Sequence, residues 1–237
     1  MKRDLSDTLE TITFTAYAIF LVIALLVQGP GGAGFSEDPL ANSTDPYDTT
    51  SPEESYPTRT SEGLLYRFYE DHVVVMGMGD CYDVDVVIPA YYEGFPVTVV
   101  GMSAFEGCSG LRSITIPDTV TIIQISAFAN CDSLESIRFS KALESIEPYT
   151  FSGCFNLREV KLPNTLKEIG TWAFSACNAL TSITIPESVE TIGGEIFYGC
   201  SNLNAIFFEA ETPPHGMPSN WLNGCDSATV YWGETGR

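Results

Sequence analysis

A period of 23 residues is the feature that most constrains how this chain folds. Five cysteines follow one another at this spacing (Cys108, Cys131, Cys154, Cys177 and Cys200), and five phenylalanines keep the same step from Phe105 to Phe197. Further apolar columns share the period, including one that begins at Leu111 and one that begins at Ile114. Because one short repeat cannot bury its own apolar residues, the repeats must stack and share a continuous core. The sequence therefore predicts a repeat solenoid.

Each repeat follows the pattern A-F-x-x-C-x-x-L-x-x-I-x-I-P-x-x-V-x-x-I-G. Ile114, Thr115 and Ile116 alternate as in a strand with one buried face, and Pro117 has no N–H to continue the hydrogen-bond ladder. The V-x-x-I step supplies a second inward pair on the opposite wall, and the A-F-x-x-C step predicts a short helical turn. We therefore expect a mainly β leucine-rich-repeat solenoid of about five 23-residue coils over residues 104–212.

The segments that flank the repeats are expected to form β caps. Residues 63–103 contain two apolar stretches, one around Tyr66 and one from His72 to Met76, which predict a hairpin around Glu70 and Asp71. Residues 213–237 form the C-terminal cap, in which residues 228–232 predict a closing strand. Irregular ends are expected because the terminal repeats of a solenoid must cover its core.

The N-terminal part of the chain has the organisation of an exported or anchored protein. Residues 11–28 are uncharged and mostly apolar, which predicts one hydrophobic helix that serves either as a transmembrane anchor or as a signal peptide. Residues 1–10 carry Lys2 and Arg3 and are expected to be a cytoplasmic tail. Residues 29–62 are rich in Pro, Ser, Thr and acid, so we expect a disordered acidic linker. The hypothesis is a cell-surface, single-pass membrane protein with its C-terminal domain outside; the alternative is a secreted protein.

The charge of the chain narrows the classes of partner. With 31 acidic and 11 basic residues the formal net charge is −20, which argues against nucleic-acid binding and against a polybasic lipid-binding surface. Residues 104–172 are nearly neutral, with six bases against eight acids. An acidic partner therefore remains compatible with the middle coils.

The repeat pattern and its lead-in resemble the BspA-like leucine-rich repeat family. The lead-in residues are Val87-Ile88-Pro89, Gly94-Phe95-Pro96-Val97 and Val100-Gly101, and the resemblance covers Val86 to about Glu209. It implies a leucine-rich-repeat fold in a surface or secreted protein, because members of the family are mostly surface or secreted proteins. Some members of the family act as adhesins. The family has no catalytic motif or defined binding residues to carry over.

The candidate chemical sites are few, and each has a simpler structural interpretation. The five-cysteine column (Cys108, Cys131, Cys154, Cys177 and Cys200) predicts buried neutral thiols, with disulfides as the alternative in an oxidising compartment. Cys81 and Cys225 are expected outside the array.

Asp80, Asp83 and Asp85 lack the spacing of a calcium loop and predict a solvated turn. We predict no metal, no cofactor and no catalysis, because neither His72 nor His215 lies in a catalytic motif.

The solvent-facing side of the repeat strands is the better candidate for binding. One position of each strand gives the row Thr115, Arg138, Lys161, Thr184 and Phe207. This row predicts a protein-binding surface with a basic centre and an aromatic end, and the alternative is an ordinary solvated face. The function that we infer is non-catalytic recognition of an extracellular protein or glycan, with adhesion as one form of it. The alternative is a structural or self-associating envelope component without a specific ligand.

Overall fold

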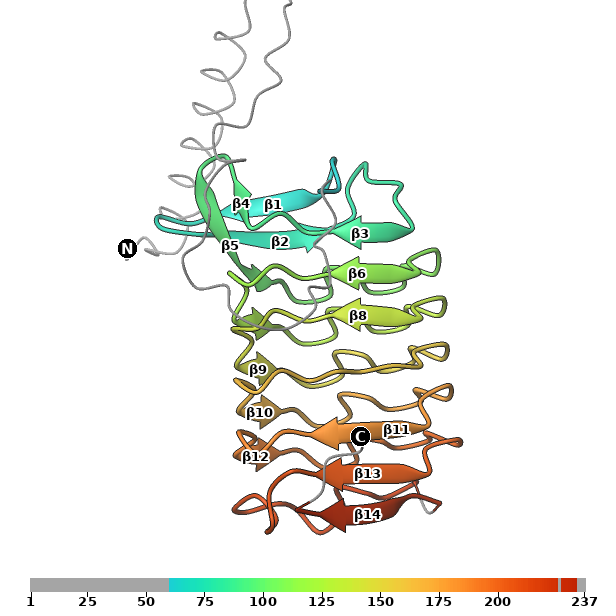
Figure 1. Ribbon diagram of the computed structural model, residues 1–237. Coiled ribbons are helices and arrows are strands. Elements are labelled where there is room, and N and C mark those ends of the chain that lie inside the picture. The colour runs from blue at the N-terminus through green and yellow to red at the C-terminus, as the bar shows by residue number, and fades with distance from the viewer. Residues whose placement is uncertain (1–59, 226, 234–237) are drawn as a thin grey trace, which may run out of the picture. The chain divides into compact units, whose positions relative to one another are not determined.

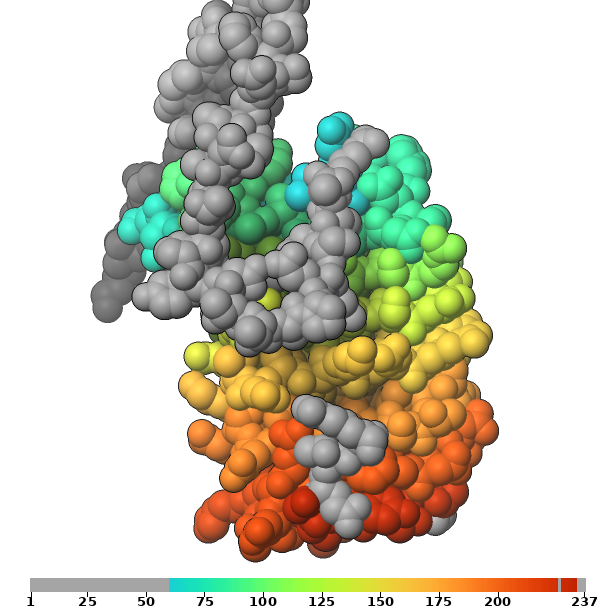
Figure 2. Space-filling view, in the orientation of Figure 1, coloured from blue at the N-terminus to red at the C-terminus, as the bar shows by residue number. Residues whose placement is uncertain are grey.

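The structure is a computed structural model that describes residues 60–225 and 227–233. It is a solenoid in which the chain winds through successive coils with strands on two walls, and the colour in Figure 1 changes steadily along the stack. In the space-filling view the coils lie on one another as successive bands (Figure 2). The predicted repeat solenoid is therefore confirmed.

One wall, called here the strand wall, carries the segments predicted from the L-x-x-I-x-I pattern. It runs β3, β6, β8, residues 159–161, β11, β13 and β14, all paired in parallel. The bounds of its strands are Asp85–Val87 (β3), Ser113–Thr115 (β6), Ser136–Arg138 (β8), Ser182–Ile185 (β11), Ala205–Phe208 (β13) and Thr229–Trp232 (β14). Isolated bridges from Ser136 to Glu159 and from Lys161 to Thr184 join the two three-stranded sheets into one surface.

The opposite wall is an eight-stranded sheet, and it contains the predicted V-x-x-I segments. Its path is β1, β2, β5, β7, β9, β10 and β12, with β4 paired to β5. The bounds are Leu65–Phe68 (β1), Val73–Gly77 (β2), Tyr91–Tyr92 (β4), Phe95–Val100 (β5), Ile122–Ile123 (β7), Ser145–Ile146 (β9), Glu168–Ile169 (β10) and Thr191–Ile192 (β12). In the regular repeats, β7, β9, β10 and β12 span two residues each, and each contains only the second apolar residue of its V-x-x-I pair.

Between the walls, the phenylalanine column forms a continuous stack of rings. Phe105, Phe128, Phe151, Phe174 and Phe197 are completely buried. Neighbouring rings along the column have centroids 5.2, 5.3, 5.4 and 6.0 Å apart, with interplanar angles from 1° to 23°. The spacing is set by the distance between paired strands, so the strand ladders and the ring stack share one repeat distance.

The A-F-x-x-C step does not form the predicted helical turn, and no helix occurs in the described part of the chain. The residue before each A-F pair has a left-handed backbone conformation, as at Ser126 (φ 56°) and Trp172 (φ 61°), which breaks a helix. Some N–H groups of this step also bond to the next coil: Phe128 N–H donates to the carbonyl of Thr150 at 2.9 Å. Successive tight turns, tied to the neighbouring coil, therefore replace the helix.

The solenoid is longer than the five regular repeats, because both caps continue the stack. On the strand wall, β3 pairs in parallel with β6 and β14 pairs in parallel with β13, which gives seven consecutive segments from β3 to β14. The predicted N-terminal hairpin is present as antiparallel β1 and β2, and the predicted closing strand is β14. The sequence pattern missed the additional coils because their spacing departs from 23 residues: Val86 aligns with Ile114, and Trp232 aligns with Phe208.

Candidate functional site

The candidate binding surface is the solvent-facing row of the strand wall, called here the outward row. Pairing places Thr115 beside Arg138, Lys161 beside Thr184, and Thr184 beside Phe207. The same register extends the predicted row at both ends, with Val87 beside Thr115 and Tyr231 beside Phe207. The outward row therefore contains Val87, Thr115, Arg138, Lys161, Thr184, Phe207 and Tyr231.

The charges of the strand wall are paired with one another, which makes its centre less basic than the row alone predicts. The Nζ atom of Lys161 lies 3.0 Å from Oε1 of Glu159, and both side chains are well exposed. The Arg112 guanidinium binds both carboxylate oxygens of Asp85, whose Oδ1 also accepts the hydroxyl of Ser113 at 2.7 Å. Hydrogen bonds from Arg112 and Ser113 lower the pKa of Asp85. Because these pairs are exposed, they orient side chains more than they stabilise the fold.

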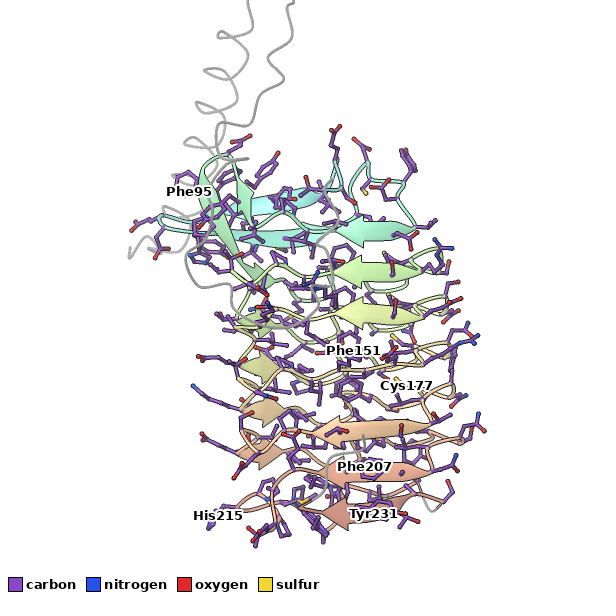
Figure 3. All side chains as sticks on the ribbon, viewed as in Figure 1. Phe95, Phe151, Cys177, Phe207, His215 and Tyr231 are labelled. Carbon is purple, nitrogen blue, oxygen red and sulfur yellow. The ribbon has the colours of Figure 1, made fainter. Side chains whose placement is uncertain are left out.

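The predicted aromatic end of the row is an ordered stack. The rings of Phe207 and Tyr231 have centroids 5.0 Å apart and an interplanar angle of 15°, and Figure 3 shows the two side chains on adjacent strands near the C-terminal end. Tyr231 is 37% exposed. On the inner side of the same strands, Phe208 and Trp232 stack with centroids 4.1 Å apart.

The cysteine column lies inside the solenoid, beside the ring stack. Cys131, Cys154, Cys177 and Cys200 are completely buried, whereas Cys108 at the N-terminal end of the column is half-buried. All of them are free thiols. Each buried thiol donates to the carbonyl of the phenylalanine one coil earlier, at 3.0 Å for Cys131 to Phe105 and 3.2 Å for Cys154 to Phe128. Each of these carbonyls also accepts the N–H of the cysteine in its own coil, as the Phe105 carbonyl does from Cys108 at 3.1 Å, so the thiol adds a second bond that joins neighbouring coils.

Burial makes several of these thiols poor nucleophiles. Desolvation raises the pKa of Cys108 to about 11 and raises the pKa of Cys177 well above its ordinary value. For Cys131, a hydrogen-bonding interaction with the neighbouring Cys154 thiol, in which Cys131 keeps its proton, and desolvation raise the pKa strongly. Since the thiolate is the reactive form, Cys108, Cys131 and Cys177 are poor nucleophiles at neutral pH. Cys200 differs, because a hydrogen bond with Cys177 lowers its pKa.

The placement of Cys225 outside the array was wrong. The Cys225 side chain is buried, and its Sγ lies 3.8 Å from the carbonyl oxygen of Cys200, so it adds a further member to the column. The step from Cys200 is 25 residues instead of 23. A search that allowed insertions of two residues between repeats would have found it.

The other residues considered for chemistry are held apart or engaged elsewhere. His72 lies between β1 and β2, where Nδ1 is 2.7 Å from Asp71 Oδ1 and the ring stacks on Tyr69. His215 is exposed near the opposite end of the solenoid (Figure 3). Asp83 accepts the hydroxyl of Ser61 at 2.6 Å, while Asp85 binds Arg112. Among the described residues, no group of three His, Cys, Asp or Glu side chains is arranged to hold a metal ion.

Three predicted N-terminal segments lie outside the described residues: the tail over residues 1–10, the hydrophobic segment over residues 11–28 and nearly all of the linker over residues 29–62. Within residues 60–225 and 227–233, no helical segment has the length and hydropathy of a membrane span. The choice between anchor and signal peptide therefore stays a prediction.

Parallel coils, a ring stack and an in-register outward row together define the class of this protein as a leucine-rich-repeat solenoid. A family model described as "BspA type Leucine rich repeat region (6 copies)" matches residues 95–215. The chain belongs to this family, as its repeat pattern predicts. A comparison with curated proteins finds no match.

Solved structures of bacterial leucine-rich-repeat proteins have similar folds. A leucine-rich-repeat protein of T. pallidum is 26% identical with a TM-score of 0.65, and the match covers 76% of this chain and 83% of that one. One from Bacteroides ovatus is 31% identical with a TM-score of 0.55, covering 65% of this chain and 48% of that one. A leucine-rich cell surface protein of Faecalibacterium prausnitzii is 22% identical with a TM-score of 0.56, covering 76% and 56%. The chain spans less than two thirds of the latter two proteins.

Proposed function

We propose that this protein is a non-catalytic recognition protein that binds an extracellular protein or glycan, with adhesion as one form of that role. The observation that carries the proposal is the outward row, in which consecutive strands present one side chain each at a regular spacing along the solenoid. Such a surface suits an extended partner, because each coil adds contacts without a change of fold. Aromatic residues and arginine, both present in the row, contribute strongly to protein interfaces.

The proposed location is the cell surface, or the medium if residues 11–28 are a cleaved signal peptide. The membership of the BspA-type family supports this proposal, and the similar protein of Faecalibacterium prausnitzii is described as a cell surface protein. Fractionation of cells with and without detergent distinguishes a retained anchor from secretion.

The test is affinity capture from native cell-surface or host-surface material with the full chain in detergent. The variant Arg138→Glu/Lys161→Glu reverses two charges of the outward row. The control Lys141→Glu/Lys167→Glu makes the same change of charge away from that row, and it disrupts the ion pair of Lys167 with Glu144 on the opposite wall. Capture should fall at least tenfold for the first variant and stay unchanged for the control.

Two results would contradict the proposal. If both variants capture the partner as well as the wild-type protein does, the outward row is not the binding site. If sedimentation of the full chain shows concentration-dependent assembly and no partner is captured, the self-associating envelope component is the better function.

A further inference from the structure

The two ends of the strand wall differ in whether their last strand is covered. At the N-terminal end, Ser61 occupies the outer edge of β3: its N–H donates to the Val87 carbonyl at 2.8 Å, and its hydroxyl oxygen accepts the Val87 N–H at 3.1 Å. Ser61 is only 6% exposed. The N-terminal edge is therefore closed by the chain itself.

At the C-terminal end, β14 pairs only with β13 among the described residues. Thr229 N–H donates to the Asn204 carbonyl at 2.8 Å and Gly233 N–H to the Ala210 carbonyl at 3.0 Å. Alternate residues of a strand direct their backbone groups to opposite sides, so the N–H and C=O of Val230 and Trp232 point to the uncovered side. In the part of the chain that the structure describes, this is an open strand edge.

The inward side chains of β14 are also incompletely buried. Val230 and Trp232 are only partly buried, whereas their partners on β13, Ile206 and Phe208, are 0% and 1% exposed. The Phe207–Tyr231 and Phe208–Trp232 stacks have nearly parallel planes. Since one face of each β14 ring covers its β13 partner, the other face is turned toward the open edge.

The charge around this end favours a basic partner. Residues 168–233 contain no lysine or arginine, and they contain seven acids (Glu168, Glu187, Glu190, Glu195, Glu209, Glu211 and Asp226). The Glu211 side chain lies at the end of β14, next to Gly233. Its Cγ atom would be 3.4 Å from a Cβ atom added to that glycine. Two copies of such an end repel each other, and the closed edge of β3 offers no complementary strand for head-to-tail stacking.

We propose that the open edge of β14 binds an extended segment of a partner protein with alternating basic and apolar side chains, as an added strand. The segment forms backbone hydrogen bonds with Val230 and Trp232. Its apolar side chains cover the exposed faces of Trp232 and Val230, and its Lys or Arg side chains lie over the free face of Tyr231 on the side of Glu211. This surface is separate from the middle of the outward row and is tested separately from it.

The probe is the peptide acetyl-TKVKVKVT-amide, titrated into the full chain in detergent, with acetyl-TEVEVEVT-amide as the matched acidic peptide. Val230→Pro removes an edge donor without removing a bond to β13, and it should weaken binding of the basic peptide at least tenfold. Glu209→Gln/Glu211→Gln should weaken it about threefold and lower its salt dependence. The control Glu62→Gln/Glu70→Gln makes the same change of charge at the N-terminal end and should leave binding unchanged.

Hydrogen exchange provides a second measurement that does not depend on a variant. The basic peptide should slow exchange of the Val230 and Trp232 amides, while the Tyr231 amide, which points toward β13, is unchanged. Equal binding of the acidic peptide, no binding of the basic peptide, or full binding by a folded Val230→Pro variant would overturn the proposal. Sedimentation that shows a second copy on this edge would also overturn it. If Val230→Pro leaves partner capture through Arg138 and Lys161 intact, the two surfaces are independent.

Discussion

The rings of Phe128 and Phe151 lie 5.3 Å apart, and the angle between their planes is 1°. Both side chains are completely buried, and Phe151 also meets Phe139 edge-on and Phe174 face to face. The stack is continuous from coil to coil, so loss of one ring leaves a cavity that the flanking strands cannot close without breaking their register.

Phe151→Ala is therefore expected to lower the free energy of unfolding by about 3–5 kcal/mol. The matched control is Phe155→Ala, four residues along the chain, where the side chain is 44% exposed and its removal should change stability little. Urea unfolding followed by circular dichroism measures both. Equal destabilisation by the two variants would show that the ring stack does not hold the coils together.

The buried thiols predict a loss of stability at alkaline pH. The pKa of Cys177 is raised well above its ordinary value of 9.0 by desolvation. Below pH 9 the Cys177 thiol keeps its proton in both the folded and the unfolded chain. Above pH 9 the thiol loses this proton only in the unfolded chain. The contribution of Cys177 to the free energy of unfolding should therefore fall with rising pH above about 9, by about 1.4 kcal/mol per pH unit.

Cys177→Ala removes one of these thiols, so its unfolding free energy should fall less steeply with pH than that of the wild-type protein. Thiol labelling of the native protein at pH 8 should be slow for Cys177, and fast once urea unfolds the chain. Rapid labelling of Cys177 in the native protein would contradict a buried, protonated thiol at this position.

Ser61 closes the N-terminal edge of the strand wall, and its replacement should loosen that edge. Ser61→Ala removes the hydroxyl that donates to Asp83 and accepts from Val87, which leaves the partly buried Val87 N–H without its acceptor. We expect a loss of about 1–2 kcal/mol in unfolding free energy and faster hydrogen exchange of the Val87 amide. Ser109→Ala, at an exposed position, is the control. An unchanged exchange rate at Val87 would mean that the backbone bond from Ser61 alone closes the edge.

The ion pair between Arg112 and Asp85 predicts an acid titration that depends on one side chain. The bond from Arg112 is the largest cause of the lowered pKa of Asp85. Arg112→Ala should raise that pKa toward its ordinary value, as measured by NMR titration of the Asp85 carboxyl. Since the folded pKa is lowered, the contribution of this group to stability is present above pH 4 and is lost as the pH falls through the folded pKa. Arg158→Ala serves as a control and should leave the titration of Asp85 unchanged.

The repeat columns predict the middle of this structure well, because each column position has one environment. Phe151 and Cys154 are buried, and Thr115 and Lys161 face outward, as the alternation of residues predicts. The ends were harder to predict because their spacing is irregular. Cys225 joins the cysteine column across a step of 25 residues, and β3 aligns with β6 across a step of 28, so a fixed period missed both.

The candidate site was predicted as a row but not as an electrostatic surface. The sequence places Arg138 and Lys161 in the outward row and therefore predicts a basic centre. It does not show that Glu159 binds Lys161, or that Asp85 binds Arg112 from 27 residues away. Charge pairing of this kind depends on the lateral register of strands and on rotamers, which a column of residue types does not specify.

The sequence by itself determined that the chain coils, which residues point inward, and that the coils stack through phenylalanine and cysteine columns. These features follow from local periodicity, because burial of the same positions in every repeat is possible only in a solenoid. The tertiary structure decided how the stack ends. Whether a terminal strand is covered depends on distant residues: Ser61 covers β3, whereas β14 has a partner on one side only among the described residues. Those are contacts between segments outside the repeat pattern, so periodicity carries no information about them.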